Sequence, residues 1–516
     1  MKLKKYLIII AAILFSGALI LFLFSDKWAE KILSSKISEV SFLSYDSLQL
    51  NLADGKLSLY NANIALPTLS TTIGKVSAEG ISIFQLIAND KIIIEDIDFT
   101  GVDFNYYSYR KSQEASDKSS LSSLPKVLIK SLKIVNSEAA WHSSKDKKRL
   151  AFNFGLTLNN INQDDVKDPY RIASKVTQLK AINLIYITKD GLYNSGVKTL
   201  QLQNRSLKAD SIYLMCNFEK YELGRYVRHE IDWYNLHIDS VAFALTNMEK
   251  LFKHHEASSI TIYNPELLVF RDKRLPFPEG KKGKLLKDLL HESKFSIGID
   301  AIEVNNGKIT YQEYVKSGDG PGEVIFDRLN ATFENLYTYD KKHNVKPRLK
   351  AKTALYGQST LYADVSFPLD RGQQTIVKGY MMPMQLVEFN QMLKYVAFTE
   401  LEDGQLDSLS FAFTYGDSTS KGNMNFGYTD LKIDFLNKQD AETGGFFNEL
   451  KGFVANTLVV NSDNPRPNGK FSVGEIHAER NFEKSMFNFW WKSVLSGFRS
   501  STGVKAAEEK IDSDAG

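Results

Sequence analysis

The residues best suited to bind a metal ion are two groups of histidines beside carboxylates, His254-His255-Glu256 and His229-Glu230. A zinc hydrolase needs two histidines that face one ion, as in His-Glu-x-x-His, and neither group continues into that pattern. No second ligand pair follows either group at zinc spacing. We interpret these histidines as surface loop residues and predict no metal site and no cofactor.

Carboxylates are concentrated in Glu95-Asp96-Ile97-Asp98, and paired carboxylates can act as general acid and base when a cleft brings them together. Strand alternation, however, places Asp96 and Asp98 opposite Ile97, on the polar face of a sheet. The chain has no Gly-x-Ser-x-Gly nucleophile motif, and the stretch that begins at Gly280 (Gly-Lys-Lys-Gly-Lys) lacks the spacing of a phosphate-binding loop. We therefore predict no catalytic residues and no enzymatic activity.

Charge and cysteine content exclude two further classes. The chain has 64 Lys and Arg against 61 Asp and Glu, so its formal net charge of +3 gives no electrostatic footprint for nucleic acid. The single cysteine, Cys216, rules out an intramolecular disulfide framework and a cysteine-based zinc cluster. We expect Cys216 to be a small buried residue.

One local run of positive charge has two interpretations. The lysines would either meet anionic lipid headgroups or form a solvated charged face, and a solvated face is the more common arrangement. The run consists of Lys281, Lys282, Lys284 and Lys287, with Arg271, Lys273 and Arg274 nearby.

A recurring ten-residue pattern indicates the elements that carry these residues. From Ile302 to Tyr311, alternating apolar residues are followed by an Asn-Asn-Gly bend and then by alternating apolar residues again. This pattern predicts strand, bend, strand, because Asn, Gly and Ser tolerate left-handed turn backbones. The bend residues of the further copies are Asn61, Asn136, Asn204 and Asn264, and Gly101 and Ser240 in looser copies.

An internal duplication supports a repetitive architecture. The block 129–141 aligns without a gap with the block 299–311, and the two duplicated regions extend over about 127–161 and 297–336. Stacked repeats can form one elongated body. We predict a mainly β fold, an elongated repetitive antiparallel sheet over residues 41–480.

Hydrophobic periodicity predicts a few amphipathic helices within and after this sheet. Apolar residues recur at helical spacing in 281–292, 383–396 and 446–458. The end of the chain, 481–500, is apolar nearly all round, so this helix must be buried in protein or at a membrane surface. Packing into the end of the sheet and docking to a partner are equally compatible with this pattern. Its candidate docking residues are Phe482, Met486, Phe489, Trp490, Trp491 and Phe498.

The N-terminus has the pattern of a membrane anchor. Residues 6–24 contain no charge, and as a helix they would span about 28 Å, close to the hydrocarbon core of a bilayer. Lysines in residues 1–5 place the N-terminus in the cytoplasm by the positive-inside rule. A cleaved signal peptide is less favoured, because the run is long and no small-x-small site follows it. We predict a juxtamembrane helix over 25–40 and a disordered tail over 501–516.

This combination of anchor, repeated short strands with Asn-Gly bends and aromatic C-terminus resembles the AsmA-like (AsmA/TamB-type) envelope proteins of diderm bacteria. The residues that carry the resemblance are the stretch from Ile299 to Gly307 (IDAIEVNNG) and the stretch from Ser485 to Gly497 (SMFNFWWKSVLSG). The resemblance implies a β-sheet curved into a gutter with an apolar interior, single-pass anchoring in the inner membrane and a periplasmic body. It also implies a part in phospholipid transport or outer-membrane biogenesis, and it carries over no catalytic residue.

Two functions therefore remain open. In the first, the gutter holds phospholipid or another lipid away from water, since apolar lining shelters acyl chains without specific polar contacts. In the second, the protein is an envelope assembly scaffold whose groove is filled by its own side chains and whose C-terminal helix docks a partner protein. The candidate gutter-lining residues are Leu132, Ile134, Ile260, Ile262, Ile302, Val304, Leu409, Phe411 and Phe413.

Overall fold

The computed structural model describes most of the chain after the N-terminal apolar run. Among the described residues, no helix combines the length and the apolar character needed to cross a membrane. The anchor predicted at 6–24, nearly all of the juxtamembrane segment and the helix predicted at 446–458 lie outside the described part. The described residues are 30–31, 34–35, 42–51, 54–82, 91–110, 126–145, 147–203, 205–245, 247–338, 345–368, 373–436 and 461–502.

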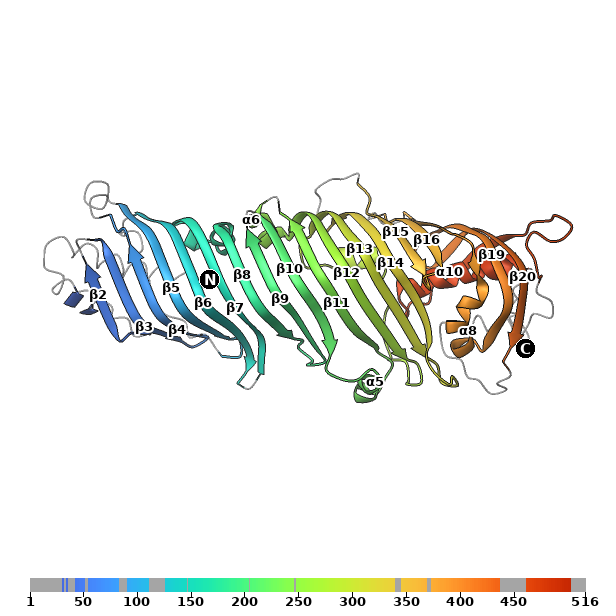
Figure 1. Ribbon diagram of the computed structural model, residues 1–516, viewed down its shortest axis with the longest axis horizontal. Helices are drawn as coiled ribbons and strands as arrows, with labels where there is room; N and C mark the ends of the chain where they lie inside the picture. Colours follow the sequence, from blue (N-terminus) through green and yellow to red (C-terminus); the bar gives the residue numbers. More distant parts are fainter. Residues whose placement is uncertain are drawn as a thin grey trace, which may run out of the picture. The chain divides into compact units, whose positions relative to one another are not determined.

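The protein is mainly β, with 21 strands in the described part (Figure 1). It divides into two compact units. Unit 1 contains residues 1–213 and 240–258, and unit 2 contains residues 214–239 and 259–516. Three strands have residues in both units: β10 (Ser206–Cys216), β11 (Asp232–Ala244) and β12 (Glu256–Asp272).

Unit 1 is built from long strands with only short helices in its described part. Alternation of apolar and polar residues along these strands gives one apolar face. The elements are β1 (Leu43–Ser44), β2 (Ser47–Asn51), β3 (Lys56–Leu66), β4 (Leu69–Glu79), β5 (Lys91–Tyr107), β6 (Lys126–Ser144), β7 (Lys147–Asn162), η2 (Asp165–Lys167), α4 (Pro169–Ser174), β8 (Val176–Ile187), β9 (Tyr193–Gln203) and α6 (Met248–His254).

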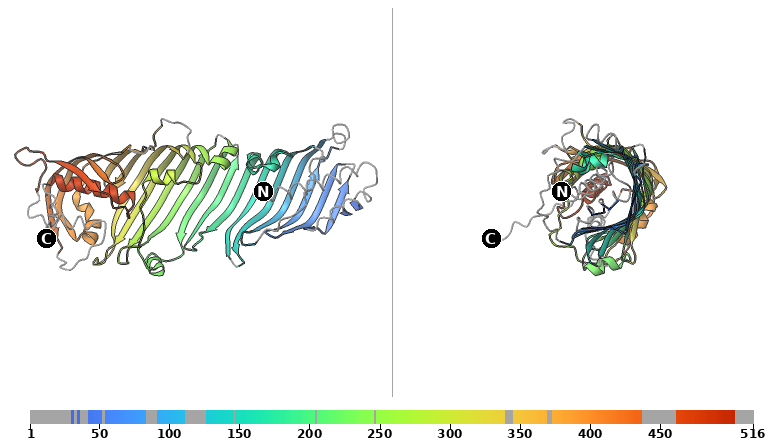
Figure 2. Two further views of the ribbon diagram at one scale, coloured as in Figure 1. Left: turned by 180° about the vertical axis from the view of Figure 1, so that it is seen from behind. Right: turned by 90° about the vertical axis from the view of Figure 1, so that its left-hand side faces the viewer.

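Unit 2 combines antiparallel strands with helices that pack on the concave face of its sheet (Figures 1 and 2). Its elements are α5 (Glu222–Val227), α7 (Leu286–His291), β13 (Gly298–Tyr314), β14 (Gly322–Tyr337), β15 (Arg348–Leu355), β16 (Ser359–Ser366), β17 (Thr375–Met381), β18 (Met384–Gln385), η3 (Leu386–Phe389), α8 (Asn390–Val396), β19 (Thr399–Tyr415), β20 (Thr419–Phe435), β21 (Val473–Glu479) and α10 (Met486–Ser501).

The sheet is mixed, so the prediction of a purely antiparallel sheet is wrong. In unit 1, β5 and β6 pair in parallel, with Ile97 opposite Leu132 and Phe99 opposite Ile134. A parallel pair needs a connection long enough to return the chain to the start of the next strand. Residues 108–125 supply that length, which accounts for the long Ser- and Lys-rich segment between these strands.

The Asn and Gly residues of the repeat have the predicted left-handed backbone but do not reverse the chain. Asn61, Asn136, Asn264 and Asn306 have φ values of 51°, 49°, 48° and 54°, and Gly101 has a φ value of 67°. Each lies inside one continuous strand, so strand–bend–strand is wrong for these five copies. It is correct for the copy around Asn204, where β9 ends at Gln203 and β10 begins at Ser206. The pairing register shifts there instead, for example between Val304 and Gly307 in β13 and between Ile134 and Ser137 in β6, as at a β-bulge.

In unit 2, these bulges are joined across neighbouring strands by side-chain hydrogen bonds. Asn264 Nδ2 donates to Asp239 Oδ2 at 2.8 Å, and Asn306 Nδ2 donates to Asn264 Oδ1 at 2.8 Å. The backbone N–H of Asn306 donates to Asn330 Oδ1 at 3.2 Å. The result is a polar ladder across β11 to β14 that links the bulges at Asn264 and Asn306 to their neighbouring strands and supports the register of these strands.

The two duplicated regions fold alike. In each, two long strands pair antiparallel, with Leu132 opposite Leu158 in one and Ile302 opposite Phe333 in the other. Asn160, two residues after Leu158, and Asn335, two residues after Phe333, both have positive φ.

Candidate functional site

The candidate site in unit 1 is an apolar face formed by rows of side chains that run across the strands. Every second residue of a strand points to the same face, and the strand register aligns these residues from strand to strand. The first row contains one residue from each of β2 to β9, namely Leu48, Leu59, Val76, Phe99, Ile134, Leu156, Leu179 and Leu202.

A second row lies beside the first, two or three residues along each strand. It contains Leu50, Leu57, Ala78, Ile97, Leu132, Leu158 and Val176. We call these two rows the unit 1 apolar face.

Exposure changes along the unit 1 apolar face. Leu59 and Val76 are buried in its β2–β4 part, whereas Phe99, Ile134 and Leu156 are only half-buried. Among the described residues, the apolar cluster of this face contains no helical residue. The predicted lining residue Leu132, like Ile134, therefore lies on a surface that no described helix covers.

Unit 2 has a corresponding row that begins open and ends covered. Ile302, Phe333 and Leu349 are half-buried, and the residues that follow on β16, β17, β19 and β21 are buried, whereas Gly422 on β20 is half-buried. The full unit 2 apolar row is Ile302, Phe333, Leu349, Val365, Val377, Phe413, Gly422 and Ile476.

The other predicted lining residues of unit 2 are half-buried or buried. Ile260 and Ile262 on β12 and Val304 on β13 are half-buried. On β19, Leu409 and Phe413 are buried in a cluster to which α10 contributes Phe489. The remaining one, Phe411, packs partly buried against this cluster, and its ring fills the space above Gly379. Near β19 the protein's own side chains therefore fill the apolar surface.

Helix α10 covers this part of unit 2 through a seam of small residues. Ser493 Oγ donates to Ser420 Oγ at 2.8 Å, and a Cβ on Gly497 would lie 2.9 Å from Ile476 Cγ1. Gly474 on β21 faces the carbonyl oxygen of Gly497, so the helix backbone approaches the sheet closely. Glycine and serine permit this approach because they have little or no side chain.

The six predicted docking residues of the C-terminal helix divide between core and surface. Phe489 is buried, and its ring meets the Tyr415 ring edge-on at 5.3 Å. Phe482 is exposed and precedes the helix. The ring of Phe487, which the sequence analysis did not single out, is 69% exposed. The remaining four residues, Met486, Trp490, Trp491 and Phe498, are half-buried.

A cluster of buried charges, which was not predicted from the sequence, is formed by residues of β11 and β13, by Arg271 of β12 and by Lys273 directly after β12. Lys273 Nζ lies 2.6 Å from Glu313 Oε1, with the two side chains only 4% and 0% exposed. Arg271 donates to both carboxylate oxygens of Asp232, from Nε at 2.5 Å and from Nη2 at 2.7 Å. Tyr311 donates its hydroxyl proton to Glu313 Oε2 at 2.6 Å.

The electrostatics of this cluster favour fixed ion pairs. Burial alone would raise the pKa of Asp232, but the hydrogen bond and charge of Arg271 outweigh it and hold that pKa below its ordinary value. Burial raises the pKa of Tyr311 well above its ordinary value, so this tyrosine remains a donor. Arg271 and Lys273 are thus engaged within the fold and do not form the solvated face that was the favoured interpretation.

The alternation of side chains between the two faces of a strand could have revealed this cluster from the sequence. Counting by twos from Val269 on the apolar face leads to Arg271 and Lys273, and counting from Ile309 leads to Tyr311 and Glu313. Charges of opposite sign at apolar-face positions of two strands indicate a buried pair.

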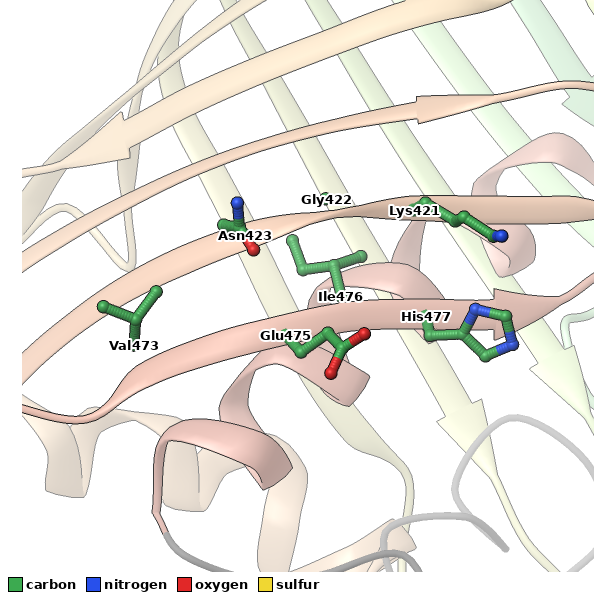
Figure 3. Close-up of a pocket in the computed structure, with 7 residues that line it drawn as sticks. All are labelled: Lys421, Gly422, Asn423, Val473, Glu475, Ile476 and His477. Atoms are coloured by element: carbon green, nitrogen blue, oxygen red, sulfur yellow. The ribbon is translucent and has the colours of Figure 1, made fainter.

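An open depression of about 830 Å³ crosses β20 and β21 (Figure 3). Polar side chains contribute much of its wall, which makes it a poor site for an acyl chain. Its lining residues are Lys421, Gly422, Asn423, Val473, Glu475, Ile476 and His477.

No cluster of metal ligands accompanies these surfaces. Among the residues that the structure describes, no three His, Cys, Asp or Glu side chains come together in a way that would hold an ion. His254 ends α6, and His255 has a left-handed backbone as its C-terminal cap.

Fold and site together define a mainly β protein with a half-buried apolar face in unit 1, whose described cluster contains no helical residue, and a helix-covered apolar row in unit 2. No family model matches the sequence, and no curated protein matches it.

Proposed function

We propose that the protein binds lipid by laying acyl chains on the unit 1 apolar face. The observation that supports this proposal is the first row of that face, one apolar residue on each of eight strands in a single register. Seven strand spacings make it about 34 Å long. Each sheltered CH₂ group of a bound chain would contribute about 0.8 kcal/mol, so a long chain needs no specific polar partner.

The resemblance to AsmA-like proteins gives this activity a cellular setting. In this proposal, residues 6–24 anchor the chain in the inner membrane by one pass, and the rest of the chain lies in the periplasm. The unit 1 apolar face lies on the inside of a gutter, and the protein takes part in phospholipid transport or outer-membrane biogenesis.

The test compares two adjacent residues of β6. Ile134 lies on the unit 1 apolar face, whereas Val135 is 40% exposed and points to the other face. The full-length protein is purified from membranes, and its bound phospholipid is quantified by mass spectrometry. Ile134→Asp should lower the lipid content at least about fivefold, because a carboxylate interrupts the row; Val135→Asp should leave it unchanged. Equal lipid content in both variants, or a lipid-free wild-type protein, contradicts the proposal.

A second function, an envelope scaffold, is favoured by one observation in unit 2. Helix α10 fills the apolar row there, while Phe487 remains exposed on its outer side. In this alternative, α10 docks a partner protein of the envelope through its outer face. Phe487→Glu should then abolish co-purification of that partner and leave the lipid content unchanged. Unchanged co-purification would exclude Phe487 from such docking.

A further inference from the structure

At one edge of unit 1, the apolar surface changes into an aromatic row and then into a group of cations. This edge lies at the ends of β5, β6, β7 and β8, the lower edge in Figure 1. The strand register aligns Tyr106, Trp141, Leu150 and Tyr186 there. Two residues further into the sheet, the same register joins the apolar residues of the next row, such as Phe104 and Ala139.

The aromatic row is held in place by ring contacts and by one polar contact. The rings of Trp141 and Tyr186 stack with centroids 6.4 Å apart. Trp141 Nε1 donates to Ser108 Oγ at 2.9 Å, so its polar end faces the edge. Tyrosine and tryptophan favour such positions, because each combines an apolar ring with one hydrogen-bonding group.

Cations lie immediately beyond the aromatic row. Among the described residues, none of them forms an ion pair. Arg110 lies over the rings of Tyr107 and Tyr109 at 3.9 Å and 5.6 Å. Arg149 donates to neutral oxygens, including Ser143 Oγ and the Lys189 carbonyl, each at 2.8 Å. We define the unit 1 rim as Tyr106, Trp141 and Tyr186 with Arg110, Lys147, Lys148, Arg149 and Lys189.

The opposite edge of unit 1 carries charge of both signs, and several of its cations are paired. Lys56 lies 3.4 Å from Glu79, and Lys130 lies 2.7 Å from Glu95. Two further cations of this opposite edge form ion pairs with Asp165. Two carboxylates lie near the rim. Asp190 already accepts from the Thr188 hydroxyl and the Leu192 N–H, and Asp103 accepts from the Asn105 amide. Uncompensated positive charge is therefore concentrated at the rim.

The titration of a neighbouring histidine agrees with this charge distribution. The Tyr107 ring stacks on His142 at 4.8 Å. Partial burial lowers the pKa of His142, and the positive charges of Lys148 and Arg110 lower it further and outweigh the opposite effect of Asp103. The existing groups therefore create a field at the rim that an anion would relieve.

We propose that the unit 1 rim binds the anionic, phosphate-bearing headgroup of a phospholipid whose acyl chain lies on the unit 1 apolar face. This inference rests on the proposed function. The order of surfaces, apolar then aromatic then cationic, follows the order of groups along such a lipid from chain end to headgroup. It predicts that the bound lipid has one orientation and that the site prefers anionic to zwitterionic headgroups.

The test uses the full-length protein and soluble short-chain lipids with identical chains. One has a phosphatidylglycerol headgroup, the other a phosphatidylcholine headgroup, and inorganic phosphate is the third probe. The rim variant combines Lys147→Gln, Lys148→Gln and Lys189→Gln. The control combines Lys126→Gln, Lys180→Gln and Lys198→Gln in the same unit, so both variants lose three positive charges.

In the wild type, phosphatidylglycerol should bind more tightly than phosphatidylcholine, and inorganic phosphate should not compete. The rim variant should lose at least about tenfold in affinity for phosphatidylglycerol, since each lysine near an anionic lipid contributes substantially to binding. Its affinity for phosphatidylcholine, and both affinities of the control variant, should change less than about twofold.

Four outcomes would overturn the inference. Equal wild-type affinity for both lipids, or equal losses in the rim and control variants, removes the headgroup site but leaves lipid binding intact. Competition by inorganic phosphate alone assigns the rim to free phosphate. Failure of both lipids to bind contradicts the proposed function as well, so the two ideas fail by different results.

Discussion

The buried charges of unit 2 illustrate how single residues constrain this fold. Lys273 and Glu313 lie in the protein interior, where an ion loses its hydration and only a close partner compensates. Glu313 has two partners, the Lys273 ammonium and the Tyr311 hydroxyl. Removing one partner therefore costs far more than removing the whole pair.

The first prediction concerns this pair. Lys273→Met should lower the free energy of unfolding by about 3–5 kcal/mol, because Glu313 remains buried without its cation. The double variant Lys273→Met with Glu313→Leu should recover much of that loss, since no charge is left behind. Urea unfolding of the two variants and the wild type measures both effects. A single variant as stable as the wild type would show that Glu313 finds compensation elsewhere.

The second prediction concerns pH, through Asp232. Its pKa is held below the ordinary value of 3.8 in the folded protein, so the ionised form stabilises the fold. This contribution is complete well above pH 3.8 and is lost as the pH falls through the lowered pKa. The stability difference between the wild type and Asp232→Asn should therefore be constant near neutral pH and shrink in acid below 3.8. A stability difference that increases on acidification would contradict a lowered pKa for Asp232 in the folded protein.

At the scale of elements, the sequence predicted conformation better than topology. The Asn residues of the repeat that the structure describes were correctly expected to have left-handed backbone, because that preference is local to the residue. Whether such a residue reverses the chain or forms a β-bulge depends on the hydrogen-bonding groups of the neighbouring strand. Asn306 bonds Asn264 and Asn330 on adjacent strands, and no local pattern contains those partners.

Two further elements show the same limit. Of the helix predicted over 281–292, only α7 at Leu286–His291 forms, and 383–396 divides into η3 and α8. The parallel pairing of β5 with β6 is not encoded by alternation, which is the same for either strand direction. Individual residues of the unit 1 apolar face could be predicted from the sequence. Their alignment into continuous rows could not, since it depends on the register between strands.

The third prediction concerns the seating of helix α10. Gly474→Ala should displace the helix, because the added methyl group would meet the Gly497 carbonyl oxygen on the helix backbone. Gly416→Ala is the matched control, since nothing lies within 4 Å of its Cβ position. The expected result is faster proteolysis near Asn481 and a changed tryptophan emission in the Gly474 variant only. Unchanged proteolysis and emission would mean that the sheet, and not helix α10, moves to accommodate the added methyl group.

For the whole molecule, the important contrast lies between the apolar surfaces of its two units. The unit 1 apolar face has half-buried residues, and its described apolar cluster contains no helical residue, whereas α10 covers much of the unit 2 row. The same alternating strands thus produce two chemical outcomes, and the presence of a covering helix decides between them. Lipid binding and self-filling, which the sequence left as rival interpretations, can apply to different parts of one chain.

The fourth prediction tests this contrast in the intact protein with a fluorescent fatty acid as probe. The wild type should bind it, and Ile134→Asp should reduce the binding at least about fivefold, because a carboxylate interrupts the unit 1 apolar face. Gly474→Ala should raise the number of probe molecules bound per chain, since displacing α10 uncovers Phe413 and its neighbours. In the double variant, the binding that remains should be the new, unit 2 component. If Gly474→Ala adds no binding while α10 is displaced, the covered row does not accept acyl chains, and α10 is then part of the core of unit 2 rather than a cover over a second site.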